Sequence, residues 1–454
     1  WNLVCDRSHL ASMSQSLYMF GYVLGAVIFG YLSDRYGRRP IIWITIVIEI
    51  LAGISSALSI NIIHFMISRV ILAFASNGRL LSTFMLVNEC VGPKHRATIG
   101  MFIQVGWAVG YCLLPAIAYM FPNFRHMILA TSIPEVLWLV WLIAVPESPR
   151  WQITHHRWDR AEHQLMKAVV INKLPLDDIH NQFEVLKNSI SEEESKMNVR
   201  TNCLDLLKTP NLRRSTLIMY FTWFVNSFVY YGISLNIGDF GGNLFVSFFI
   251  AGLIEFPSYL FPIFAFKYVG RRPVTAGLMY FSGLSCFAII PFISYPILWL
   301  RITVAMIGKF FITSSYGVVY VYAAEIYPTV IRQVGVGSCS VAARVGSMLA
   351  PFVKDLNVYT GMGVVLSLFG TLSMADGIAI HFLPETRGQH IADTLEEAEL
   401  LNSIENLWES CNFSIRNGQL HGKSVPYREC SSKGGSVIVV MFGSDLHLGG
   451  FQML

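Results

Sequence analysis

Two charged residues lie in the middle of long apolar runs of this sequence. Arg344 stands among Ala, Gly and Ser, and Glu255 is followed by Pro257. An arginine fork binds a carboxylate through two hydrogen bonds, and a carboxylate beside aromatic rings suits a quaternary ammonium group. In a membrane each such charge costs about 2.5–3.5 kcal/mol, so both should face a water-filled cavity or a partner. Two interpretations follow: the two residues bind a charged ligand, or they pair with each other as a structural salt bridge.

Other charged residues also interrupt apolar runs. Arg79, within "SNGRLLS", would add a second positive group to a cavity and would favour anions. Glu49, Glu135 and Asp376 are further acids, any of which could bind a proton or sodium, but their spacing forms no recognisable constellation. Lys309 is expected to snorkel toward the membrane surface or to bridge helices.

The elements that carry these charges are apolar runs of about 20 residues, the length that a helix needs to cross a bilayer. The chain of 454 residues is 54% hydrophobic and only 14% charged, with a mean hydropathy of +0.51, whereas a soluble domain carries about 25% charged residues. This composition predicts an all-α polytopic membrane protein, and the net charge of +4 is too small to indicate nucleic-acid binding. Eleven spans are predicted, at residues 11–33, 41–60, 63–88, 97–120, 125–145, 215–236, 243–266, 273–294, 296–324, 332–354 and 360–383.

The loops on the two sides of the predicted spans differ in charge. One set is rich in lysine and arginine and includes GRRP at 37–40, the segment 147–214 and GRRP at 270–273. The opposite set holds little that is basic except Arg125. By the positive-inside rule the first set is cytoplasmic, and the C-terminal tail is then cytoplasmic too.

An internal repeat relates the two halves of the chain, because motifs recur in the same order at offsets of 232–238 residues. The matched pairs are Arg69 with Arg301, GRRP 37–40 with 270–273, Glu89 and Arg96 with Glu325 and Arg332, and PES 146–148 with PET 384–386. Since order and side are preserved, the halves are parallel repeats related by an axis along the membrane normal. The same offset places the partner of span 215–236 before residue 3, so a complete parent is expected to have six plus six spans.

The repeat divides the chain into four predicted parts. They are an N-terminal helical bundle at 1–145 (spans 2–6 of such a parent), a cytoplasmic loop at 146–214, a C-terminal bundle at 215–385 (spans 7–12) and a cytoplasmic tail at 386–454. The tail is expected to be largely disordered, because it becomes polar and rich in Gly and Ser after about residue 400.

Seven stretches of the sequence, in this order, resemble solute carrier family 22, the organic cation, organic anion and carnitine transporter branch of the major facilitator superfamily. They are "WNLVCDR" at 1–7, "PESPRW" at 146–151, "DLLKTPNLRRSTL" at 205–217, "YYGISLN" at 230–236, "GKFFITSSYGVVYVYAAEIYPTVIR" at 308–332, "ARVGSMLAPF" at 343–352 and "LPETRGQ" at 383–389. The resemblance covers residues 1 to about 400 and lacks the family's first span. The second cytoplasmic motif also departs from the first, with Lys267 where the first has Asp34.

The resemblance implies a binding site at the midplane between the halves. In this family the position of Arg344 is arginine in anion and carnitine carriers, and the position of Glu255 is acidic in cation and carnitine carriers. Both charges together fit a zwitterion such as carnitine, or a mixed organic-ion substrate. Tyr230, Tyr231 and Tyr316 are similar to cavity-lining aromatics of the family, and Gln104 is similar to a lining polar residue. Ordinary helix packing is the alternative for the tyrosines.

The resemblance also implies a cytoplasmic latch that holds the two halves together when the carrier faces outward. Its candidate residues are Asp34, Arg38, Arg39, Glu89, Arg96, Arg150, Glu325, Arg332 and Glu385. The alternative is that these arginines only fix the topology, although topology alone needs no acid beside them.

Other classes of function find little support in the sequence. No P-loop, HExxH or GxSxG motif is present, and the eight cysteines form no CxxC pair, so neither an enzyme nor a metal site or cofactor is expected. The predicted function is a multi-pass, polyspecific organic-ion transporter of the plasma membrane that works by alternating access. Its expected partners are a small organic ion and membrane lipid, with a sodium or proton coupling ion left open. A sugar carrier and a non-transporting truncated membrane protein are the alternatives.

Overall fold

The structure is a computed structural model of a helical membrane protein. It describes residues 1, 3, 7–172, 183–185, 187, 189, 206–294, 297–388, 399, 413–420, 423–432 and 435–440. Nine helical segments among them are long and apolar enough to cross a membrane. All eleven predicted spans fall on helices, including the two that are not among those nine, 97–120 and 215–236. The all-α membrane fold predicted from composition is therefore confirmed.

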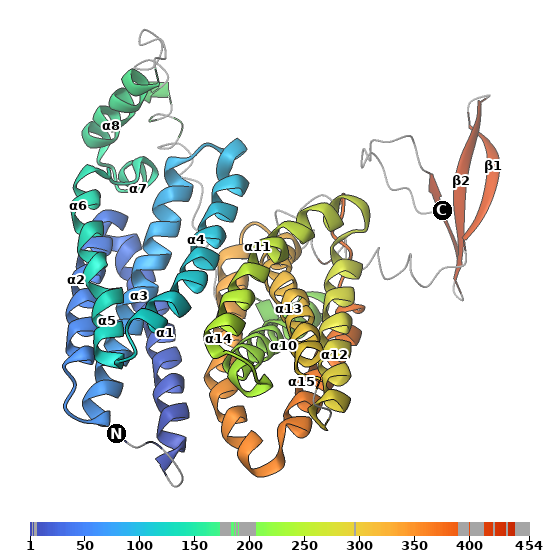
Figure 1. Cartoon of the computed structure of the whole chain (residues 1–454). Helices are drawn as coiled ribbons and strands as arrows, with labels where there is room; N and C mark the ends of the chain where they lie inside the picture. Colours follow the sequence, from blue (N-terminus) through green and yellow to red (C-terminus); the bar gives the residue numbers. More distant parts are fainter. Residues whose placement is uncertain are drawn as a thin grey trace.

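The N-terminal half forms one bundle (Figure 1). Its helices are α1 (His9–Tyr36), α2 (Arg38–Ala57), α3 (Ile62–Cys90), α4 (Pro93–Met120), α5 (Phe124–Ser132), the 3-10 turn η2 (Ile133–Glu135) and α6 (Val136–Ala144). Pro134 lies in η2, which joins α5 and α6 into one apolar segment. Two short helices follow on the loop predicted to be cytoplasmic, α7 (Pro149–Thr154) and α8 (Trp158–Ile171).

The C-terminal half repeats this arrangement with one helix more. It consists of α10 (Pro210–Leu235), the 3-10 turn η4 (Ile237–Phe240), α11 (Leu244–Tyr268), α12 (Arg271–Ser294), α13 (Leu298–Ile326), α14 (Arg332–Thr360) and α15 (Met362–Ile380). Its core is large and includes Trp223 on α10, Tyr322 on α13 and Phe369 on α15, all almost completely buried. This half therefore provides a rigid frame for charged side chains.

Two pairs of helices join the halves: α1 packs on α14, and α4 packs on α11. In Figure 1 these four helices lie where the two bundles meet. The internal repeat relates α1 to α11 and α4 to α14, so it exchanges the two pairs. Such an exchange is what a two-fold axis along the membrane normal requires, and it supports the parallel repeat inferred from the sequence.

Part of the C-terminal tail is a small antiparallel sheet. Its strands are β1 (Phe413–Leu420), β2 (Lys423–Ser432) and β3 (Gly435–Val440), in the order β1-β2-β3. Phe413 pairs with Cys430, and Tyr427 pairs with Val440. These three strands lie within the tail that the sequence predicts to be largely disordered, and for the tail as a whole that expectation stays a prediction. The run "SVIVV" at 436–440 is rich in β-branched residues, which favour strands.

Candidate functional site

Arg344 lies half-buried on α14, at the contact between the two halves. Its guanidinium carbon is 4.6 Å from the centre of the Tyr22 ring, which belongs to α1 of the other half. The charge of Arg344 is also close enough to interact with Tyr231, Tyr316 and Tyr320. No ion pair joins Arg344 to a carboxylate among the residues that the structure describes. Within the described part of the chain, this arginine is therefore a positive charge surrounded by tyrosine side chains.

Glu255 lies completely buried on α11, and its cationic partner is Lys309 rather than Arg344. The Lys309 ammonium on α13 is 3.3 Å from Glu255 Oε1, and neither side chain has exposed surface. The hydroxyl of Tyr230 donates to Glu255 Oε1 at 2.6 Å, and that of Tyr259 donates to Oε2 at 3.2 Å. The suggested salt bridge between Arg344 and Glu255 is thus replaced by a different pair.

Tyrosine rings connect the two charged positions. Tyr230 packs against Tyr231 at 5.2 Å between ring centres and against Tyr316 at 5.7 Å. The structure therefore brings together Arg344, Glu255 and the three predicted tyrosines. Gln104 is exposed on α4, and no described contact joins it to this group. The roles of all six residues in binding stay predictions.

The sequence analysis did not include Lys309, Tyr22 and Tyr111 in this site. Lys309 was expected to snorkel or to bridge helices. Lys309 bridges helices, because it donates to Ser234 Oγ of α10 at 2.6 Å and pairs with Glu255 of α11. Its complete burial excludes snorkelling. One signal was available, because Lys309 and Tyr316 are seven residues apart and so share a face of one helix.

The N-terminal half holds a second buried charge cluster. Arg79 on α3 donates to both oxygens of Glu49 on α2, Nε to Oε2 at 2.5 Å and Nη2 to Oε1 at 3.0 Å. Glu135 in η2 lies close enough to Glu49 and Arg79 for their charges to interact. Three residues that form no constellation in the sequence therefore form one in space. Since Glu49 neutralises Arg79, Arg79 is not a free positive group in a cavity.

Asp376, the fourth acid noted from the sequence, is completely buried on α15 in the C-terminal half. Its Oδ1 accepts a hydrogen bond from Thr222 of α10 at 2.7 Å. Because the contact joins two helices of the same half, we interpret Asp376 as part of the internal packing of that half.

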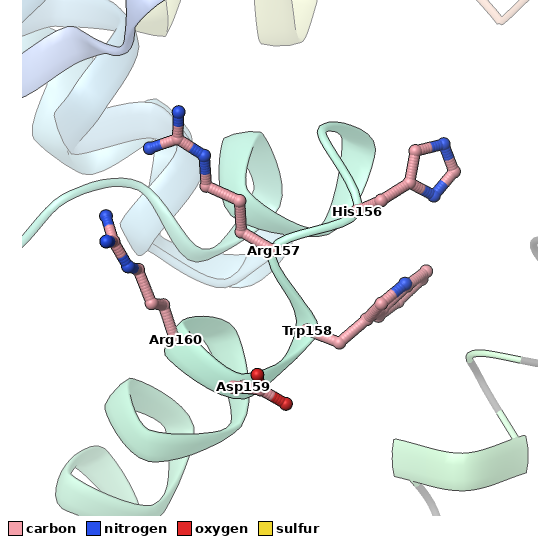
Figure 2. A pocket seen from close by; sticks show the side chains of 5 residues that line it. All are labelled: His156, Arg157, Trp158, Asp159 and Arg160. Carbon is pink, nitrogen blue, oxygen red and sulfur yellow. The ribbon is translucent and has the colours of Figure 1, made fainter.

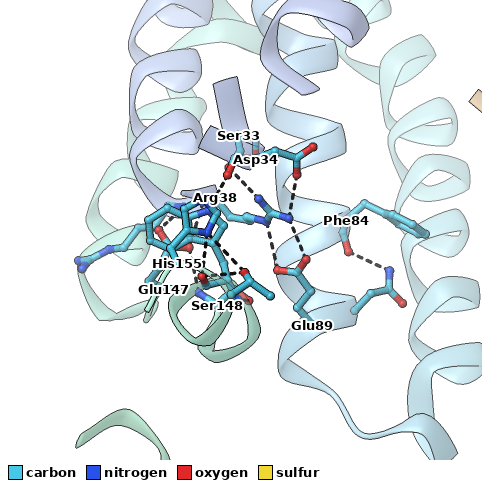
Figure 3. Close-up of polar contacts among 12 residues, drawn as sticks. Ser33, Asp34, Arg38, Phe84, Glu89, Glu147, Ser148 and His155 are labelled. Atoms are coloured by element: carbon cyan, nitrogen blue, oxygen red, sulfur yellow. Dashed lines mark hydrogen bonds and ion pairs between the residues drawn. The ribbon is translucent and has the colours of Figure 1, made fainter. Parts of the chain in front are cut away.

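The GRRP motif of the N-terminal half organises a charge cluster at the predicted cytoplasmic end (Figure 3). Arg38 lies 2.9 Å from Asp34 and 2.9 Å from Glu89. Glu147 Oε1 accepts from the backbone amides of Arg38 and Arg39 and so caps the start of α2. Gly37, with a φ of 109°, makes the turn, and a Cβ there would lie 2.5 Å from Glu147 Oε2.

The second GRRP motif builds the same cluster in the C-terminal half. Arg271 lies 3.0 Å from Glu325, and Glu385 accepts from the backbone amides of Arg271 and Arg272 at 2.9 and 3.2 Å. Gly270 has a φ of 108°, almost equal to that of Gly37. Glu147 is therefore the counterpart of Glu385, as the match of PES with PET in the repeat predicts, although Glu147 is not among the predicted latch residues.

The remaining latch candidates lie apart from these ion pairs. Arg39 donates to the carbonyl of Ile143, Arg332 donates to Tyr327 and Thr329, and Arg150 is exposed on α7. The side chain of Arg96 lies outside the described residues. Each ion pair described here joins residues of one half, so a latch between the halves stays a prediction.

Removal of Arg38 is expected to destabilise the N-terminal half. Glu89 is 14% exposed and would lose its cationic partner, so Arg38→Gln should lower the free energy of unfolding by about 3–5 kcal/mol. Thermal unfolding of the purified protein in detergent, followed by tryptophan fluorescence, would measure the loss. Arg35→Gln is the matched control, because Arg35 is exposed and bonds only Tyr31 of its own helix. Equal stability of the two variants would contradict the structural role of Arg38.

A surface pocket lies on the loop between the two halves, away from these charges (Figure 2). It is lined by five consecutive residues, His156, Arg157, Trp158, Asp159 and Arg160. Figure 2 shows Arg157 and Arg160 pointing to one side and His156 and Trp158 to the other. The five side chains do not converge, so the buried charges are the stronger candidate site.

Comparison with known proteins agrees with this architecture. Residues 5–398 match the family model described as "Sugar (and other) transporter". The chain is 37% identical over 431 residues to "Organic cation transporter protein" of Drosophila melanogaster, which covers 93% of this chain and 78% of that protein. It is 34% identical over 405 residues to "Solute carrier family 22 member 3" of Mus musculus, with 89% and 72% covered.

Solved structures show the same fold. The inward open conformation of the xylose transporter XylE from E. coli superposes with a TM-score of 0.66 over 87% of this chain and 90% of that chain, at 20% identity. A crystal structure of the D-xylose-proton symporter gives a TM-score of 0.63 at 19% identity, with 84% and 89% covered. At these identities the likeness shows the major facilitator fold alone and gives no information about the substrate of this chain. The chain belongs to the sugar (and other) transporter family of the major facilitator superfamily and, within it, to solute carrier family 22, the organic cation transporters.

Proposed function

We propose that this chain transports organic ions that carry a carboxylate, with carnitine-like zwitterions as the preferred class, across the plasma membrane. The observation that carries the proposal is Arg344, a half-buried arginine between the halves with no carboxylate partner among the described residues. A guanidinium presents two parallel donors to a carboxylate, and a substrate would supply the missing anion. The ammonium group of a zwitterionic substrate would then contact the tyrosine rings and Glu255.

The charge balance of the site supports an anionic or zwitterionic substrate over a simple cation. Lys309 neutralises Glu255, so the charge of Arg344 is the excess charge of the group. A substrate with one carboxylate would compensate it, whereas a simple cation would add a further positive charge. The relatives named as organic cation transporters support the wider class of organic ions.

The contacts between the halves support alternating access. Tyr119 near the end of α4 packs against Phe245 near the start of α11, with ring centres 5.6 Å apart, and Tyr111 stacks on Phe248 at 6.2 Å. These ends lie opposite the GRRP clusters. The halves therefore touch on the predicted extracellular side, as in a carrier open to the cytoplasm. We place the C-terminal tail in the cytoplasm by the same orientation and assign the exposed apolar residues of α6, Val140, Trp141 and Ile143, to lipid.

Uptake of labelled carnitine, tetraethylammonium and an aromatic carboxylate tests the proposal. In cells that express the full chain, Arg344→Ala should lower carnitine and carboxylate uptake at least about tenfold, because a charge-assisted bidentate contact is worth about 1.5–3 kcal/mol. Glu255→Ala should lower the uptake of carnitine and tetraethylammonium and should spare the uptake of the aromatic carboxylate. Lys354→Ala is the control on the same helix, because Lys354 is exposed. Undiminished carboxylate uptake by Arg344→Ala would exclude the proposed role of this residue.

A non-transporting protein is the alternative that this experiment also addresses. Absence of uptake of all three probes, with the protein present at the cell surface, would contradict the transport function itself. Loss of tetraethylammonium uptake alone in Glu255→Ala would instead indicate a carrier of simple cations.

A further inference from the structure

The ammonium group of Lys309 sits in a cage of the kind that recognises organic cations. Its Nζ is 3.9 Å from the centre of the Tyr230 ring and 5.0 Å from that of Tyr111. It also lies 3.3 Å from Glu255 Oε1 and donates to Ser234 Oγ. Aromatic faces around a positive nitrogen, with a carboxylate beside them, are how proteins bind quaternary ammonium ligands.

The cage does not depend on Lys309 to hold its shape. Tyr230 and Tyr259 each donate a hydroxyl to Glu255, so both carboxylate oxygens keep a hydrogen bond if the ammonium leaves. Ser234 donates to the carbonyl of Tyr230 in its own helix at 2.7 Å. The carboxylate would then remain in place, without a cation, for another positive group.

The cage is also shared between the two halves of the carrier. Tyr230, Glu255 and Lys309 come from α10, α11 and α13 of the C-terminal half, whereas Tyr111 comes from α4 of the N-terminal half. Any motion that separates α4 from α11 removes the Tyr111 ring from the ammonium. Tyr231 and Tyr316 contact Tyr230 of the cage and also lie near Arg344, so tyrosine rings connect the cage to Arg344.

We propose that Lys309 is a resident cation in the subsite for the positive group of the substrate, and that substrate and Lys309 compete for Glu255 and the tyrosine rings. The inference rests on the proposed transport of organic ions and adds the residue that sets the preference among them. While Lys309 occupies the cage, a cationic group of the substrate must displace it. The apparent affinity for that substrate is then the affinity of the free cage multiplied by the fraction of time that the cage is free. A carboxylate that binds at Arg344 meets no such competitor. Lys309 thereby favours zwitterions, which gain a second contact, over simple cations, which do not.

Lys309→Met tests the proposal through the KM for tetraethylammonium uptake. If a cage free of its lysine is a minor state of about 10% or less, the KM should fall about tenfold or more, while the KM for the aromatic carboxylate should stay within about twofold. Lys309→Arg keeps a resident cation and should keep the high KM for tetraethylammonium. Lys354→Met, an exposed lysine on α14, is the control for the loss of a positive charge.

The outcomes separate the inference from the proposed function. If the wild-type chain transports none of the probes, the proposed function fails. If it transports them and Lys309→Met at the cell surface shows an unchanged or higher KM for tetraethylammonium, the resident-cation inference is overturned. If Lys309→Met alone does not reach the cell surface, the double variant Lys309→Met with Glu255→Gln tests the inference instead, because it removes both charges of the buried pair together. This double variant should raise the KM for tetraethylammonium and spare that for the carboxylate, and equal effects on both would overturn the inference.

Discussion

Gly252→Val is expected to abolish most transport while the protein still reaches the cell surface. Gly252 lies where α11 crosses α4 of the other half, and a Cβ at this position would be 2.7 Å from Cys112 Sγ, 3.0 Å from the Tyr111 ring and 3.1 Å from the Cys112 backbone nitrogen. The sulfur can rotate away, but the backbone nitrogen cannot. A valine would therefore hold α4 and α11 apart, and the carrier could not close on this side.

The expected size of this effect follows from the cost of overpacking. Forcing extra methyl groups into a tight contact costs about 1–3 kcal/mol, which corresponds to a roughly 5- to 150-fold loss of the closed conformation. Because transport requires both conformations, uptake of any substrate should fall by a similar factor. Each half keeps its own core, so the fold should survive.

Two measurements would establish the cause of the loss. Uptake of labelled substrate gives the rate, and labelling of Cys112 by a membrane-impermeant thiol reagent added outside gives the conformation. Labelling should be faster in Gly252→Val, and the difference should vanish when Cys112→Ala is added. Gly277→Val on α12 is the matched control, since no atom lies within 4 Å of a Cβ at Gly277. Wild-type uptake by Gly252→Val would contradict closure through this contact.

The sequence predicts those parts of the molecule that depend on local chemistry. Spans follow from runs of apolar residues, and the turns at Gly37 and Gly270 follow from glycine before a helix start. The repeat also predicts which loops carry the arginine clusters. In each half the arginine and its glutamate partner, such as Arg38 with Glu89, lie at the same end of two neighbouring antiparallel spans, so the pairing of these spans brings them together.

Partners of the buried charges could not be read from the sequence in the same way. Lys309 and Glu255 are on different helices, and which of several cations reaches Glu255 depends on how α10, α11 and α13 pack. The spacing of charges along the sequence does not show how each of these helices is rotated about its own axis relative to its neighbours. Arg344 differs, because a charge in the middle of a span indicates a cavity whatever its neighbours are. Intramembrane charge therefore predicts where a candidate site lies, whereas the ion pairs within that site could not be predicted from the sequence.

Arg79→Met should be the most destabilising of the substitutions considered in the N-terminal half. The variant leaves Glu49, which is 5% exposed, without its bidentate cation and next to a second acid, Glu135. Breaking a buried pair by removing one partner costs about 3–5 kcal/mol. We therefore expect a much lower melting temperature in detergent and little protein at the cell surface.

A compensating change separates this electrostatic cause from lost packing. Arg79→Met combined with Glu49→Gln removes both charges, and the glutamine amide can donate to Glu135, so most of the stability should return. Replacement of a buried ion pair by groups that leave no charge unpaired is often nearly neutral. Melting temperatures of the single and the double variant, measured under the same conditions, distinguish the electrostatic cause from lost packing. If the double variant melts no higher than Arg79→Met, the arginine stabilises the half through its volume and not through its charge.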